Sequence, residues 1–168
     1  EKTETYQYNY DFANWIFYQP TEHKIFDSSD QLLLHKYYEY NNKDLIYESQ
    51  VNLDGGENIA VSYDYDSHGN LISVISPNEH ETEYEYDSTF TYMIKETNPL
   101  DQEINYVYDY STGQLSSVTD PNGNSVNYVY DAFGRKIKEI RQGDSTISPS
   151  IEYIYEVNGI APESVITK

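Results

Sequence analysis

The chain has 168 residues, which suits one ordinary domain, and its formal net charge at pH 7 is −19, from 10 basic and 29 acidic side chains. Phosphate groups need clustered Lys and Arg, so this charge disfavours nucleic acids and anionic membranes; it favours solubility, with recruitment of cations or a basic partner as the alternative. The sequence contains no cysteine and no apolar run of roughly 20 residues, which excludes disulfides and gives no sign of membrane insertion.

Tyrosine dominates the aromatic content, with 20 Tyr against 5 Phe and one Trp. Tyr favours strands, buries a large ring and keeps a hydroxyl that can stay in water. This composition suits a β-sheet whose faces are incompletely buried.

The first part of the chain, residues 1–62, carries two imperfect tyrosine doublets, Tyr8-Asn9-Tyr10-Asp11 and Tyr38-Glu39-Tyr40-Asn41. Alternation of Tyr with a polar residue predicts strands. Loops are expected at residues 27–30 and 53–58. Residues 1–5 do not resemble a signal peptide, and the chain starts in mid-pattern, so we expect a piece of a longer protein.

A clean repeat occupies residues 63–142, where Tyr-x-Tyr-Asp returns about every 22 residues and Pro77, Pro99 and Pro121 keep the same period. A fixed period in this range marks a repeat array. The signature residues are Tyr63, Tyr65, Asp66, Tyr84, Tyr86, Asp87, Tyr106, Tyr108, Asp109, Tyr128, Tyr130 and Asp131.

Each 22-residue unit predicts one antiparallel hairpin, because two strand patterns alternate with two turn patterns. In the clearest unit, residues 105–131, a turn containing Gly113 and a turn containing Pro121 and Gly123 flank the strand at residues 115–119. Gly69 and Gly134 mark shorter turns in neighbouring units. Pro99-Leu100-Asp101-Gln102 replaces Pro121-Asn122-Gly123-Asn124, so we expect a different turn type there.

Three apolar pairs lie three residues apart: Leu71 with Val74, Leu115 with Val118, and Ile137 with Ile140. A regular strand would place the members of each pair on opposite faces. The pattern therefore predicts either a β-bulge in every second strand, which would curve the sheet, or a sheet with both faces partly covered.

The last part, residues 143–168, holds a loop expected at 143–150 and a final doublet, Tyr153-Ile154-Tyr155-Glu156. The expected fold is therefore all-β: a single repeat array across residues 1–168, built of six or seven antiparallel hairpins in a curved, twisted meander. Residues 1–62 and 143–168 are its degenerate repeats. The tyrosines are expected to serve packing between repeats, with stacking on sugar rings as the alternative.

No residue pattern predicts catalysis, a cofactor or a metal. Residues 64–69 resemble the opening of a calcium loop, but its twelfth position is Ile75 instead of Glu. Pairs such as Glu81 and Glu83 could mimic a glycosidase pair, yet 29 acidic residues produce such pairs by composition. The four histidines show no metal-binding spacing. We expect no enzyme activity and no cofactor, and we interpret the signature residues as structural.

The repeat resembles the YD repeats of the Rhs family. Tyr130-Asp131-Ala132-Phe133-Gly134-Arg135-Lys136 fits the Tyr-Asp-x-x-Gly-Arg-Leu motif, with Lys136 in place of Leu, and residues 118–124 fit its Thr-Asp-Pro-x-Gly turn. Among Rhs proteins the chain is similar to bacterial toxin-complex (Tc) B-type proteins. The resemblance implies a hollow β-shell of many repeats that encloses a toxic C-terminal segment. Asp120-Pro121-Asn122-Gly123 matches the self-cleavage motif of such shells but lies within a repeat, so we interpret it as a turn.

The resulting hypothesis is a non-catalytic wall segment of a large, secreted or cell-surface bacterial protein. Its expected partners are other repeats of the same parent chain and an encapsulated toxin segment. A carbohydrate- or cell-surface-binding module is the alternative function. Exposed sheet edges also allow an edge-to-edge dimer, which the negative charge weakens.

Overall fold

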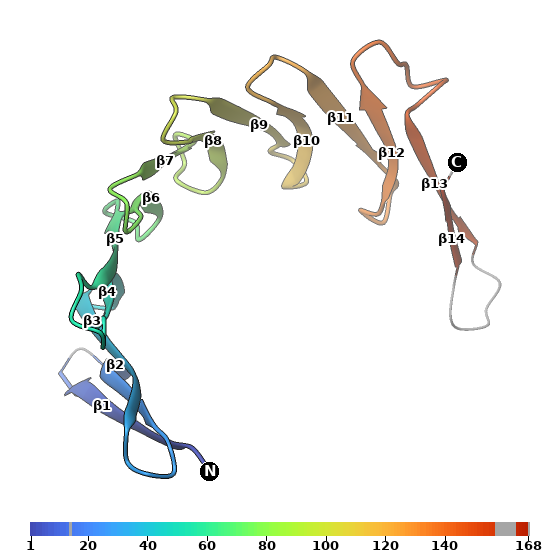
Figure 1. Ribbon diagram of the computed structural model, residues 1–168. Coiled ribbons are helices and arrows are strands. Elements are labelled where there is room, and N and C mark those ends of the chain that lie inside the picture. The colour runs from blue at the N-terminus through green and yellow to red at the C-terminus, as the bar shows by residue number, and fades with distance from the viewer. Residues whose placement is uncertain (14, 157–163, 168) are drawn as a thin grey trace. The chain divides into compact units, whose positions relative to one another are not determined.

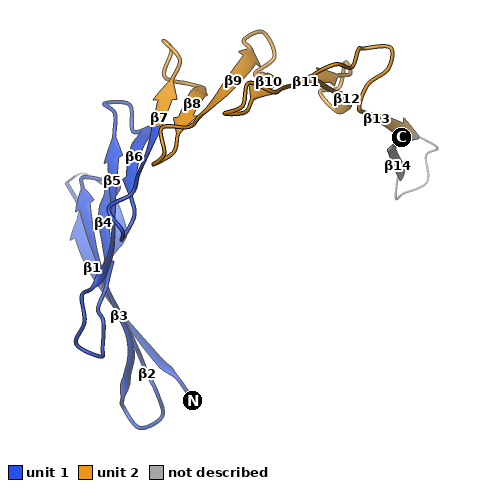
Figure 2. Cartoon of the chain, turned by 45° about the horizontal axis from the view of Figure 1, so that its top comes forward, with its two compact units in different colours: residues 1–83 blue, residues 84–168 orange. Residues whose placement is uncertain are grey.

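A computed structural model describes residues 1–13, 15–156 and 164–167 of the chain. In these residues the chain forms fourteen β-strands joined by turns and loops (Figure 1), which confirms the all-β prediction. The strands belong to two compact units, Glu1–Glu83 and Tyr84–Lys168, shown in separate colours in Figure 2. The single array across both units, and the curvature of the sheet, stay predictions.

Unit 1 is an antiparallel meander in which each strand pairs with the next one along the chain. Glu81–Glu83, the part of β7 that belongs to this unit, pairs with β6. The strands are β1 (Thr3–Asp11), β2 (Ile16–Phe26), β3 (Leu32–Asn41), β4 (Asp44–Gln50), β5 (Ile59–Tyr65), β6 (Leu71–Ile75) and β7 (Glu81–Tyr86).

Unit 2 continues the same pattern of antiparallel neighbours. The strands are β8 (Met93–Thr97), β9 (Glu103–Asp109), β10 (Gln114–Thr119), β11 (Ser125–Tyr130), β12 (Lys136–Arg141), β13 (Ile151–Glu156) and β14 (Ser164–Thr167). The loops expected at residues 27–30, 53–58 and 143–150 all lie outside strands.

The predicted β-bulges are present in the second strand of the clean hairpins. Tyr63 pairs with Val74 and Tyr65 with Leu71, so Ile72 is the extra residue of β6. The same shift in β10 leaves Ser116 as the extra residue between Leu115 and Ser117. Since the bulge adds one residue, the two apolar side chains that lie three apart come to the same face.

The third pair, Ile137 with Ile140, does not follow the expected pattern. The bulge of β12 falls at Ile137 itself, between Lys136 and Lys138, and Ile140 lies opposite Asn127. Lys136 and Glu139, which lie opposite Tyr130 and Tyr128, therefore take the positions that the apolar pair has in β6 and β10.

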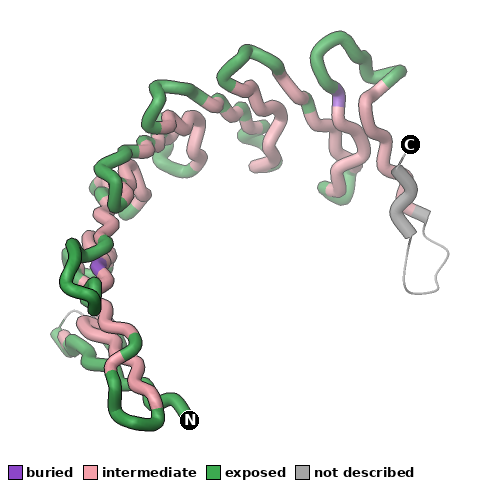
Figure 3. Tube along the Cα trace, in the orientation of Figure 1, coloured by how far each residue is buried: buried purple, intermediate pink, exposed green. Residues whose placement is uncertain are grey.

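No thick hydrophobic core forms in the described part of either unit. Among the described residues, Ile140 is the one buried hydrophobic side chain, whereas Gln19, Ser49 and Asp87 are buried polar ones. Most strand residues are half-buried and most turn residues are exposed (Figure 3). Stability must come chiefly from contacts between neighbouring strands, as in other repeat arrays.

Candidate functional site

The tyrosine doublets of the repeats all lie on one face of their strands. In β9, Ile104, Tyr106 and Tyr108 are half-buried, whereas the alternating Glu103 and Val107 are exposed. In β7 the pattern is the same, with Tyr84 and Tyr86 half-buried between exposed glutamates. We call this side of each unit the tyrosine face. Its existence confirms that the two rings of a doublet point the same way.

Aliphatic side chains separate successive doublets on this face. Tyr108 lies opposite Leu115 and Tyr106 opposite Val118, and directly opposed side chains on one face are close enough to pack. Burial raises the pKa of both tyrosines. Tyr108 also stacks on Tyr92, with ring centroids 4.7 Å apart. Around β9 and β10 the face is thus a half-buried packing layer of tyrosine and aliphatic side chains.

The second tyrosine of a doublet can also tie its hairpin to the preceding one by a hydrogen bond. The Tyr130 hydroxyl donates to the carbonyl oxygen of Leu115 at 2.9 Å, and the Tyr155 hydroxyl donates to that of Lys136 at 2.8 Å. Leu115 and Lys136 are the residues just before the bulges of β10 and β12. The bulge disturbs the regular ladder there, and the tyrosine of the next doublet satisfies the carbonyl oxygen.

A charged pair interrupts the tyrosine face of unit 2. Lys136 Nζ binds Glu139 Oε1, and the Tyr153 hydroxyl donates to the same oxygen at 2.7 Å. Lys136 Nζ also lies 5.2 Å from the ring centroid of Tyr128 and 5.1 Å from that of Tyr153. The bonds from Lys136 and Tyr153 hold the pKa of Glu139 below its usual value. Sequence reasoning noted Lys136 as a departure from the Rhs motif but missed its partner.

The aspartate of the Tyr-x-Tyr-Asp signature closes the turn that follows it. Asp66 Oδ1 accepts hydrogen bonds from the backbone N–H groups of His68 and Asn70, at 2.8 and 2.9 Å. Burial raises the pKa of Asp66, but the hydrogen bonds from Asn70 and His68 outweigh burial and the pKa lies below its usual value. The backbone N–H of Gly69, with φ +86°, donates to the Asp66 carbonyl oxygen.

The same turn closes hairpins at both ends of their strands. A side-chain oxygen that accepts from the N–H groups two and four residues later is found at Asp27, Asp66, Asn98, Asp120 and Asp131. The residue three positions later has positive φ in all five turns: Asp30, Gly69, Asp101, Gly123 and Gly134.

The expectation of a different turn type at residues 99–102 is therefore wrong. Asn98 replaces Asp as the acceptor, and Asp101 takes the left-handed conformation, with φ 58°, that Gly123 takes in the next repeat. Asn and Asp tolerate this conformation better than most residues. Pro121 directly follows the acceptor Asp120. Proline has no backbone N–H, and the turn uses the N–H groups of Asn122 and Asn124 instead, so proline fits at this position.

The turns that begin at Asp87 and Asp109 vary this scheme. Asp87 is only 5% exposed and accepts from the Thr89 hydroxyl at 2.5 Å and from the N–H groups of Thr91 and Tyr92. The Thr89 bond is the largest cause that lowers the pKa of Asp87 to about 2. Asp109 accepts from both the hydroxyl and the N–H of Ser111, and its carbonyl accepts from Gly113.

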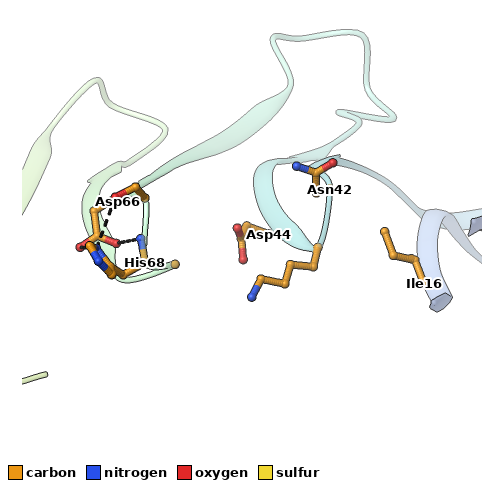
Figure 4. A pocket seen from close by; sticks show the side chains of 8 residues that line it. Ile16, Asn42, Asp44, Asp66 and His68 are labelled. Atoms are coloured by element: carbon orange, nitrogen blue, oxygen red, sulfur yellow. Dashed lines mark hydrogen bonds and ion pairs between the residues drawn. The ribbon is translucent and has the colours of Figure 1, made fainter. Parts of the chain in front are cut away.

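The turns at one end of the strands of unit 1 line a polar hollow of about 420 Å³ (Figure 4). Ile16, Asn42, Asp44, Asp66 and His68 come to it from three successive hairpins. Asp66 is fully engaged in its own turn, which explains the calcium-like spacing of residues 64–69 without an ion. Within the described residues there is no group of three His, Asp or Glu side chains that could hold a metal.

The described residues also contain no helix long and apolar enough to cross a membrane.

Comparison with known proteins identifies the repeat. Residues 65–103 and 108–147 match the family model RHS Repeat, just under half of the chain. No curated protein sequence gives a match. The structure titled Photorhabdus luminescens Tc holotoxin pore, mutation TccC3-D651A, is similar over 99% of this chain, with 15% identity and a TM-score of 0.60. The TcdB2-TccC3-Cdc42 structure is similar over 98%, with 14% identity and a TM-score of 0.58. This chain spans only 10% and 9% of the length of those chains, and at 15% and 14% identity the likeness shows the fold alone.

Proposed function

We propose that this chain, which contains repeats of the RHS family, is a non-catalytic wall segment of a large exported bacterial protein of the Rhs or toxin-complex type. In this role the hairpins stand side by side and form part of a layer that separates an enclosed segment of the parent protein from the solvent. The tyrosine face supplies the packing of this layer, and the aspartate turns hold each hairpin in register.

The observation that carries the proposal is the repetition of the same local bonds. Five turns share one hydrogen-bonding scheme, and two tyrosine hydroxyls bind equivalent carbonyl oxygens in successive hairpins. Such repetition makes an extended layer in which each hairpin is held by the same set of local bonds. It does not concentrate reactive groups at one place, which a catalytic site requires.

The similarity of fold to a segment of the Tc holotoxin supports the same role. Nearly all of this chain superposes on about a tenth of that protein, so the hairpin array can be one part of a much larger assembly. Export from a bacterial cell and contact with a toxin segment are properties that we infer for the parent protein of this chain.

Protease protection tests the enclosure. The full-length protein that carries this segment is treated with trypsin, and the half-life of its C-terminal segment is compared with that of the same segment expressed alone. Enclosure predicts digestion at least tenfold slower in the full-length protein. A matched variant, Tyr130→Ala, should loosen the wall and restore part of the digestion. Equal digestion rates of the enclosed and the free segment would refute the proposal.

The alternative function, carbohydrate binding, is favoured by one specific feature. The β1–β2 hairpin exposes aromatic side chains to a degree that the clean doublets do not reach.

A further inference from the structure

One position of the tyrosine face alternates between Glu and Val in the even-numbered strands from β4 to β12. In chain order it is filled by Glu48, Val74, Glu96, Val118 and Glu139. It lies opposite the first tyrosine of a doublet where Val74 faces Tyr63, and equally where Glu139 faces Tyr128. The three glutamates also lie opposite aliphatic residues of the next strand, which are Val61, Ile104 and Ile151. Every second hairpin therefore brings a carboxylate into the tyrosine packing.

Two of these three carboxylates hold the ammonium group of a lysine. Lys36 Nζ lies 2.6 Å from Glu48 Oε1 in unit 1. In unit 2, Lys136 Nζ binds Glu139 Oε1 and also lies 5.2 and 5.1 Å from the ring centroids of the tyrosines on either side. A carboxylate and the faces of aromatic rings both attract a compact cation. We call the combination of one such carboxylate with the tyrosines on both sides of it an ammonium box.

Glu96 has the same surroundings as the other two glutamates. The Tyr106 hydroxyl donates to Glu96 Oε2 at 3.4 Å, which repeats the 2.7 Å bond from Tyr153 to Glu139 at a greater length. Burial raises the pKa of Tyr84 and of Tyr106, and the negative charge of Glu96 raises both further. The carboxylate therefore lies close to the first tyrosines of two successive doublets.

The chain supplies no ammonium to the box around Glu96. Met93 stands three residues before Glu96, where the lysine of β12 stands before its glutamate. Lys95 lies on the other face and binds Glu85 and Glu103. Among the described residues, no Lys or Arg forms an ion pair with Glu96. A half-buried carboxylate without a cation is unfavourable, so this box favours a cation from elsewhere.

We propose that Tyr84, Glu96 and Tyr106 form a binding site for an alkylammonium group from outside the chain, of the kind that lysine side chains and polyamines carry. The ammonium bonds to the carboxylate, and the two rings contact its charged end and its methylene groups. All three side chains are half-buried, so a ligand can reach them. The site lies within unit 2 and does not depend on the wall function.

Nuclear magnetic resonance of the whole chain, with carbon-13-labelled tyrosine rings, tests the site at physiological ionic strength. The probes are a glycyl-lysyl-glycine peptide blocked at both ends and spermidine. The same peptide with norleucine in place of lysine keeps the alkyl chain and lacks the ammonium. The proposal predicts saturable shifts of the Tyr84 and Tyr106 ring signals with both ammonium probes and none with the norleucine peptide. Tighter binding of the lysine peptide would identify a protein partner as the source, and tighter binding of spermidine a free polyamine.

Matched variants locate the binding. Glu96→Val gives β8 the residue that Val74 and Val118 supply in β6 and β10, so the circular dichroism should persist while affinity falls about tenfold. Met93→Lys supplies an internal ammonium, as the lysine of β12 does, and should block both probes. Glu83→Val removes the same charge from the other side of β7 and should leave affinity unchanged. The proposal is overturned if the norleucine peptide shifts the same signals, if Glu83→Val weakens binding as much as Glu96→Val, or if Met93→Lys leaves binding intact.

Discussion

Replacement of Tyr130 by Phe isolates the hydrogen bond that links successive hairpins of unit 2. The hydroxyl donates to the Leu115 carbonyl oxygen at 2.9 Å, within the usual range for an O–H donor. Both groups are half-buried, so the variant loses a net contribution of about 1 kcal/mol, near the middle of the range for such bonds. A loss of about 1 kcal/mol corresponds to about fivefold more frequent opening.

Hydrogen exchange measured by mass spectrometry is the suitable assay, because unfolding of a repeat array is local and need not be two-state. Amides of β10 and β11 should exchange about fivefold faster in Tyr130→Phe, and those of β1 and β2 should not change. Tyr155→Phe removes the equivalent bond to Lys136 and should act on β12 and β13. Tyr128→Phe is the control, since no hydrogen bond of its hydroxyl is found among the described residues. The reasoning fails if Tyr128→Phe accelerates exchange as much as Tyr130→Phe.

Three further predictions concern the turns and the charged pair. Because the pKa of Asp87 falls from 3.8 to about 2 on folding, its contribution to the stability of the turn is complete above pH 4 and is lost between pH 4 and 2. Hydrogen exchange corrected for intrinsic rates should show this loss at residues 87–92, and Asp87→Asn should abolish the pH dependence. A transition above pH 5 would contradict the assignment. Gly123→Ala should destabilise by about 1–2 kcal/mol, measured by hydrogen exchange of β10 and β11, through backbone strain alone, since φ is +82° and no atom lies within 4 Å of a new Cβ. Asp101→Gly at the same turn position should be neutral or stabilising, and equal losses in both variants would exclude strain as the cause. Lys136→Leu should destabilise unit 2, because it leaves the Glu139 carboxylate half-buried among tyrosines without its partner. The double variant Lys136→Leu with Glu139→Val restores the pattern of Leu115 and Val118, so it should be as stable as the original chain or up to about 3 kcal/mol more stable. A double variant less stable than Lys136→Leu alone would contradict this.

The periodic part of the fold could be predicted because its signals are local. Alternation within Tyr106-Val107-Tyr108 defines the inward and outward sides of a strand without knowledge of the neighbours. The spacing of Leu115 and Val118 predicts a bulge, because only one extra residue brings both to the side of the tyrosines.

The turns were harder to predict because different amino-acid sequences can form the same turn geometry. Asp120-Pro121-Asn122-Gly123 and Asn98-Pro99-Leu100-Asp101 differ in sequence, yet both need only an acceptor at the first position and a tolerated positive φ at the fourth. Sequence periodicity also gave no sign that bulky Trp15 and Tyr18 would take positive φ, at 57° and 72°.

Exposure of the β1 tyrosines, Tyr8 and Tyr10, could not be predicted from the signature itself. Tyr8 and Tyr10 have the same spacing and acidic successor as Tyr106 and Tyr108. Their different burial depends on neighbouring strands: β9 pairs on both sides, whereas β1 pairs only with β2 among the described strands. Burial in such an array is a property of the strand's place in the sheet.

The shared turn scheme also bears on how the array can change in evolution. Several hairpins join their neighbours through the same short turn, so a tandem duplication of such a unit would place most residues in surroundings equivalent to their former ones. Deletion of one such unit would also change the surroundings of few remaining residues. The number of hairpins in proteins of this kind can therefore change by recombination, while substitutions inside a turn need only keep an acceptor at the first position and a residue that tolerates positive φ at the fourth.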